Sequence, residues 1–188
     1  MSKDDSKRIE KKKNKKIANL KWSFSLMGIA ALISIILSFI SEIAMRDVSL
    51  LVGTFVIIVF IGIGVLFDTI GVAVTSADEA PFHSMSSKRV KGAKMAVMLK
   101  KNSDKVSSFC CDVIGDICGI VSGAAGVAVA SKMTLLFGIY TVISGLIVTG
   151  FIAALTIGGK SFEKAIAINN GNKILYEFAK VLSIFSKN

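Results

Sequence analysis

The chain has few of the residues that build common catalytic and metal sites, with one proline, one histidine and three cysteines among 188 residues. Cys110, Cys111 and Cys118 fall in one apolar stretch without a CxxC pair, which argues against a zinc or redox site and predicts packing residues. His83 stands alone, and a lone imidazole makes a poor metal site. The sequence contains no P-loop, nucleophile elbow or HExxH motif, so we expect no enzyme.

Charge is scarce in four long stretches, which together hold only three acidic residues and no basic one. Hydrophobic residues make up 53% of the chain, a high share for a soluble domain. A helix of about 20 apolar residues can cross the hydrocarbon core, whereas β-barrels need short alternating strands. The sequence therefore predicts an all-α membrane protein with four transmembrane helices. The predicted spans are 22–41, 48–77, 106–130 and 133–159.

The connector between the third and fourth stretches is very short. Only Ser131 and Lys132 separate the two apolar runs. We therefore expect an antiparallel helical hairpin that turns at these two residues.

Lysine and arginine are distributed unevenly between the predicted loops. Residues 1–21 hold nine, residues 78–105 hold seven, and the segment from Lys160 holds five, whereas the two other connectors hold one each. Basic residues concentrate on the cytosolic side of membrane proteins. We expect a protein of the cell membrane with both termini in the cytosol.

Three segments outside the spans carry basic or amphipathic patterns. Residues 1–21 read as a basic cytosolic tail, whose position before a span favours a topology signal and contact with lipid over nucleic-acid binding. Residues 85–101 predict an interfacial amphipathic helix between spans two and three, and 172–186 a C-terminal juxtamembrane helix. Residues 22–188 thus form a single transmembrane domain.

The three acids of the apolar runs are the main candidates for a site. An ionised carboxylate in mid-bilayer is costly, so Asp68, Asp112 and Asp116 are expected to face the bundle interior. Asp112 and Asp116 are four residues apart on one helix face, where their charges repel unless a cation lies between them. Magnesium prefers oxygen ligands, and we expect the hydroxyls of Thr69 and Ser108 to complete a divalent-cation site.

Two other features allow different readings. Lys160 could neutralise the acids, in which case the chain would be a non-transporting membrane scaffold or accessory subunit. Gly115, Gly119 and Gly123 form a GxxxGxxxG ladder that lets helices approach closely, either within one chain or across a homodimer.

The order of these parts resembles the transmembrane domain of the CNNM/CorC family of magnesium transporters over residues 50–188. The resemblance rests on a basic amphipathic connector and on three segments, FDTIGVAVTSADEA, DKVSSFCCDVIGD and GGKSFEKAIAINNGNKI. It implies a homodimer, a cytosol-facing acidic cavity that binds magnesium, and export coupled to sodium. The first predicted span, 22–41, lies outside the resemblance and would be an addition to the family's transmembrane domain.

Carried over by position, the resemblance places the family's site residues on Asp68 and Thr69, and on Asp112 and Asp116. The sequence departs from the pattern where a family glutamate is Gly71. In the segment 159–164 an acid is replaced by lysine and a proline is lost. The family's cytosolic regulatory modules are absent, and a separate regulatory subunit would have to supply them. We therefore expect transport of magnesium or another divalent cation, with the scaffold as the alternative.

Overall fold

The computed structural model of the protein describes residues 24–25, 27–41, 43 and 49–185. Every regular element within these residues is a helix, and the described part contains no strand. An apolar helix over Met27–Ser41 comes first. The others are α2 (Leu50–Ser76), α3 (Ala80–Ser87), α4 (Ala93–Lys101), α5 (Ser103–Ser107), the π-helix η1 (Ser108–Gly115), α6 (Asp116–Phe137), α7 (Thr141–Asn169) and α8 (Gly171–Phe185).

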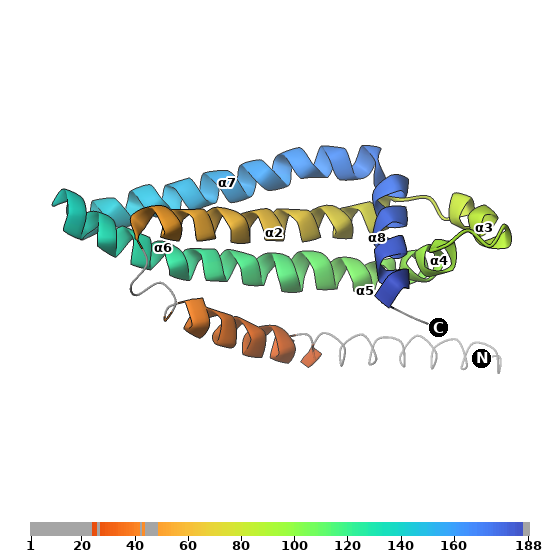
Figure 1. The fold of residues 1–188 in the computed structure, drawn as a ribbon, viewed down its shortest axis with the longest axis horizontal. Coiled ribbons are helices and arrows are strands. Elements are labelled where there is room, and N and C mark those ends of the chain that lie inside the picture. Colours follow the sequence, from red (N-terminus) through yellow and green to blue (C-terminus); the bar gives the residue numbers. More distant parts are fainter. Residues whose placement is uncertain (1–23, 26, 42, 44–48, 186–188) are drawn as a thin grey trace, which may run out of the picture.

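Three long helices lie side by side and form the body of the protein (Figure 1). They are α2, α7 and a continuous helix over Ser103–Phe137 that joins α5, η1 and α6. At a rise of about 1.5 Å per residue, each is longer than the roughly 30 Å of hydrocarbon in a bilayer. All three are long and apolar enough to cross a membrane.

The outer surface of this bundle is covered by large apolar side chains. Leu51, Leu135 and Leu146 are 82%, 84% and 69% exposed, and many Ile, Val and Phe residues are exposed beside them. Soluble monomers rarely expose apolar patches of this size. Such a surface is compatible with insertion into a membrane.

The basic tail 1–21 lies outside the described residues, and so does part of the first predicted span, 22–41. The described part of this span includes the helix Met27–Ser41, which is shorter than the other three. Ala30 and Leu37 of this helix pack against Val113, Ile117 and Val121 on the neighbouring long helix. A fourth span therefore stays a prediction.

Two apolar cores hold the bundle together. One joins Ile57 and Ile61 of α2 to Ala125 of α6 and Val148 of α7. The second lies at the opposite end, where the short helices meet α2 and α8. It contains Val74, Phe82, Ala96, Leu99, Leu175 and Ala179.

The sequence predicts that the hairpin between the last two long helices turns at Ser131 and Lys132. This prediction is wrong. α6 continues to Phe137, Gly138 ends it at φ +65°, and α7 begins at Thr141. Nothing at Ser131 breaks the helix, because its hydroxyl donates to Val127 O at 2.9 Å within the same helix. The left-handed conformation of Gly138 is the stop signal.

The predicted interfacial helix over 85–101 is two helices. α3 begins near Pro81 and ends at Ser87, and α4 begins at Ala93. Positive φ angles at Arg89 (55°) and Gly92 (84°) interrupt the chain between them. A charged, periodic segment can thus contain a tight turn that periodicity alone does not reveal.

The helix expected over 172–186 is present as α8, Gly171–Phe185, which runs across the end of the bundle (Figure 1). Gly171 is needed here, since a Cβ would lie 2.8 Å from Ser76 Oγ. Lys100 of α4 donates hydrogen bonds to Val74 O and Thr75 O, at 3.2 and 2.8 Å. This lysine satisfies carbonyls at the end of α2, where a cation is favourable.

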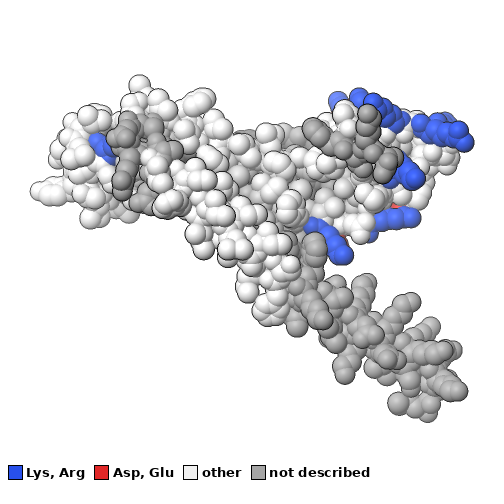
Figure 2. Space-filling view, turned by 60° about the horizontal axis from the view of Figure 1, so that its bottom comes forward, with Lys and Arg blue, Asp and Glu red and all other residues white. Residues whose placement is uncertain are grey.

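The described basic side chains gather at the end of the molecule that carries α3, α4 and α8, with a single one at the opposite end (Figure 2). Among the described residues, the basic side chain of the hairpin end is Lys132 of α6. The two ends of the bundle therefore differ strongly in charge.

Gly71 gives a test of the close packing between α2 and η1. An added Cβ would collide with Cys111 Sγ and lie 3.3 Å from Cys110 Cβ and Ser107 O, whereas a Cβ at Gly62 on the same helix meets nothing within 4 Å. We expect Gly71→Ala to lower the free energy of unfolding by about 1–3 kcal/mol through overpacking. Gly62→Ala should be neutral or stabilising, because both changes gain helix propensity. Thermal midpoints in detergent would measure both, and equal midpoints would contradict this packing.

Candidate functional site

An ion pair joins the middle of the bundle's first and last long helices. Asp68 of α2 is 9% exposed, and its Oδ2 lies 3.3 Å from Nζ of Lys160 on α7. The Lys160 side chain is 37% exposed, so it reaches the acid from the edge of the bundle. The structure thus joins the first of the predicted acids to the predicted charge partner.

A second buried acid lies next to this pair. Glu163, one turn after Lys160 on α7, is 6% exposed, and its Oε2 has no hydrogen-bond partner within the described residues. Its carboxylate is near enough to interact with Asp68, Thr69 and Lys160. A buried acceptor without a donor is costly, and such groups gather at functional sites.

The Thr69 hydroxyl cannot donate a hydrogen bond to both of the acceptors beside it. Its hydroxyl donates to Val65 O at 2.7 Å within α2, and it also faces the Glu163 carboxylate. A hydroxyl has one hydrogen, so it can serve only one acceptor at a time. Its lone pairs leave Thr69 able to contribute an oxygen ligand.

The π-helix η1 lies against the same part of α2. Cys111 Sγ lies 3.7 Å from the backbone oxygen of Asp68 and also 3.7 Å from Ser107 Oγ. A π-helical turn is rare and often occurs at functional positions. Here it places the thiol of Cys111 beside the ion pair.

A very small cavity adjoins Lys160 on the side toward the hairpin. It has a volume of about 10 Å³ and lies between α2, α6 and α7, close to the minimum for one water molecule. It is lined by Ile61, Gly64, Val65, Gly115, Cys118, Gly119, Thr156 and Lys160.

The other two predicted acids do not face the interior. Asp112 and Asp116 are both exposed on the outer side of their helix, and Ser108 is half-buried at the start of η1. The turn of η1 directs Cys110 and Val113 inward instead. No cluster of three His, Cys, Asp or Glu residues that could hold a metal occurs among the residues that the structure describes.

The glycine ladder is divided between two environments. Gly115 is buried, and a Cβ there would lie 3.9 Å from Lys160 Nζ. A Cβ at Gly119 or Gly123 would meet nothing within 4 Å. The first glycine therefore belongs to packing inside the chain. Gly119 lines the small cavity beside Lys160, and Gly123 is exposed on α6.

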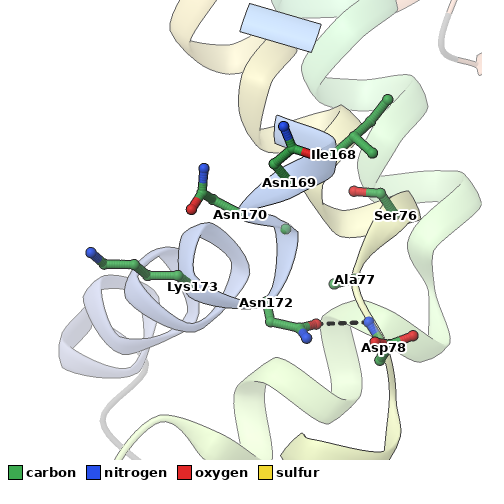
Figure 3. Close-up of a pocket in the computed structure, with 9 residues that line it drawn as sticks. Ser76, Ala77, Asp78, Ile168, Asn169, Asn170, Asn172 and Lys173 are labelled. Carbon is green, nitrogen blue, oxygen red and sulfur yellow. Dashed lines mark hydrogen bonds between the residues drawn. The ribbon is translucent and has the colours of Figure 1, made fainter. Parts of the chain in front are cut away.

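A polar pocket of about 300 Å³ lies where α2 ends and α7 turns into α8 (Figure 3). Asn172 accepts a hydrogen bond from the Asp78 backbone N–H at 2.7 Å, and Asn169, Asn170 and Lys173 surround the opening. Ser76 Oγ donates to Ala167 O at 3.3 Å and holds the two helices together beside the pocket. The pocket is a recess at the basic end of the bundle.

No family model, curated protein or solved structure matches the chain.

Glu163 is the site residue that the sequence analysis missed. It follows Lys160 by three positions, so the two share a face of α7. This spacing was a usable signal.

The buried carboxylate of Glu163 predicts a stabilising substitution. We expect Glu163→Gln to raise the free energy of unfolding by about 1–3 kcal/mol in the absence of added metal, because it removes a negative charge whose Oε2 lacks a donor. Glu177→Gln is the matched control, because the Glu177 side chain is 57% exposed and should change stability little. A lower thermal midpoint for Glu163→Gln would mean that its attraction to Lys160 outweighs the missing hydrogen bond.

Proposed function

We propose that the protein is an integral membrane protein that transports a divalent cation, magnesium first among them, through a site made by Asp68 and Glu163. The observation that carries this proposal is an uncompensated charge: Lys160 pairs with Asp68, and the buried Glu163 carboxylate next to this pair has an oxygen without a donor. Ionisable residues at membrane depth are expensive and are retained mainly for function. A cation would supply the missing positive partner.

The coordination chemistry agrees with this choice. Magnesium is bound in proteins by one or two carboxylates and usually keeps several of its waters. Asp68 and Glu163 provide two carboxylates from facing helices, and the Thr69 hydroxyl lies beside them. This site replaces the set that included Asp112 and Asp116, because those acids point outward.

The proposed orientation places the basic end of the bundle in the cytosol. Asp68 lies eight residues before Ser76, the last residue of α2, which puts it about 12 Å inside that end at a rise of about 1.5 Å per residue. The site would thus lie nearer to the cytosolic face of the membrane. α8 and the pair α3 and α4 would lie at the membrane surface, and the helix Met27–Ser41 would belong to a fourth span.

A homodimer belongs to the same proposal. The outer face of the continuous helix formed by η1 and α6 carries Asp112 and Asp116, and Gly123 is exposed further along α6. Acids on a lipid-facing surface would be costly, and glycines allow close helix contact, so a second copy would favourably cover this face. Sodium coupling and a separate regulatory subunit follow only from the resemblance to magnesium transporters.

A second function is supported by the ion pair itself. Lys160 already neutralises Asp68, as expected for a membrane scaffold that carries nothing. In that case Lys160→Ala should strongly destabilise the protein, since it leaves buried carboxylates without any cation. Under the transport proposal, magnesium should restore the stability that this variant loses.

Magnesium uptake into proteoliposomes that contain a magnesium-sensitive dye tests the transport proposal directly. We expect uptake by the wild type, and loss of uptake in Asp68→Asn and Glu163→Gln, because each removes one of two anionic ligands. Asp112→Asn/Asp116→Asn is the matched control and should retain uptake.

Two results would count against this assignment. Equal flux in wild-type and empty vesicles would favour the scaffold. Flux that survives Glu163→Gln but stops in the double variant would return the site to the outer face of α6.

A further inference from the structure

We propose that Lys160 is a tethered counter-ion that holds the cation's place at Asp68 and moves aside when a divalent cation binds. This inference rests on the proposed function, and it concerns how the same site is regulated. Its starting point is the position of Nζ, 3.3 Å from Asp68 Oδ2 and close to Glu163. An ammonium group in that position competes with any metal ion for the same carboxylate.

The charges of the site differ between the two arrangements. With Lys160 in place, the two carboxylates and one ammonium leave a net charge of about −1 if all three are ionised. A divalent cation added to that arrangement would face a like charge at short range. Once Lys160 withdraws, the remaining two carboxylates match the charge of one divalent cation.

The structure provides somewhere for the lysine to go. The small cavity that Lys160 already lines, about 10 Å³ and thus close to the size of one water molecule, lies on the hairpin side of Lys160 and is bordered by Gly64 and Gly115. Neither glycine has a side chain to fill it, and a Cβ on Gly115 would lie 3.9 Å from Nζ.

Helix geometry favours the same direction of movement. Side chains on an α-helix point back toward the preceding turn, so Lys160 extends naturally toward Thr156, one turn earlier on α7. Thr156 lines the cavity, although its hydroxyl donates to Ile152 O at 2.8 Å. The lone pairs of that hydroxyl remain available to accept a hydrogen bond from the displaced ammonium.

Exchange of this kind would lower the apparent affinity for the cation. Binding must first break the Asp68–Lys160 pair, so the observed affinity is the intrinsic affinity reduced by the fraction of molecules in the open arrangement. In the absence of cation, Lys160 would neutralise Asp68. A positive charge would then lie beside this carboxylate in both the empty and the loaded state of the site.

Thermal midpoints of the full chain in detergent, measured against magnesium concentration at constant ionic strength, test this inference. A ligand that binds only the folded state raises the midpoint by an amount that grows with the logarithm of its concentration relative to its Kd. We expect Lys160→Met to lower the midpoint without metal and to lower the magnesium concentration needed for stabilisation by about tenfold. Lys164→Met is the control, because Lys164 is the next lysine on α7 and is exposed. It should shift the magnesium dependence much less.

Gly115→Ala supplies a second, independent test. Its added methyl group would make ordinary contacts, 3.7 Å to Cys110 O and 3.9 Å to Nζ, so the variant should fold while the space beside Lys160 shrinks. We expect it to weaken magnesium binding several-fold in the wild-type background. It should have no effect in the Lys160→Met background, where no lysine has to move.

The outcomes separate the inference from the function on which it rests. Absence of any magnesium response in wild type, Lys160→Met and Lys164→Met would overturn the transport proposal together with this inference. A wild-type response that Lys160→Met does not strengthen, or that Gly115→Ala changes equally in both backgrounds, would overturn the tethered counter-ion alone. Circular dichroism of each variant would establish that its helices are intact.

Discussion

The close approach of α2 and α7 is the constraint on which the charges of Asp68, Glu163 and Lys160 depend. Charged groups can be held inside a helical bundle only if the helices approach closely and fix their partners. Small residues make this approach possible between α2 and its neighbours. A Cβ at Gly159 would lie 2.8 Å from Val65 Cγ2, and Ala73 and Ala167 are fully buried where α2 meets α7. The packing of these residues therefore determines the geometry of the charges.

The long helices could be predicted from the sequence because their apolar runs are uninterrupted over more than a membrane thickness. The ends of the helices could not, since hydropathy does not record backbone conformation. Lys132 is a charge within α6, whereas the helix ends six residues later at the left-handed Gly138. The same limitation hid the break between α3 and α4, where Arg89 and Gly92 adopt positive φ angles.

The site itself could be predicted only in part. Asp68 could be identified because charges in apolar runs are rare, Thr69 because its hydroxyl is next to that acid, and Lys160 because it directly follows the last run. The structure brings these three together. Asp112 and Asp116 satisfied the same criterion but lie outside. Which face of a helix is buried depends on its neighbours, and the π-helical turn of η1 changes the angular spacing of the residues before Asp116.

The exposed acids and the buried ones pose different physical problems. A carboxylate on the outer face of α6 can be stabilised by water, by a second copy or by local thinning of the bilayer, so its position alone implies little about a bound ion. Glu163 has no such freedom, because its carboxylate is enclosed and its Oε2 lacks a donor. The single positive charge of Lys160 can offset the negative charge of only one carboxylate. The shortage of positive charge at this one position, rather than the number of acids in the apolar runs, is what favours a cation as the missing partner.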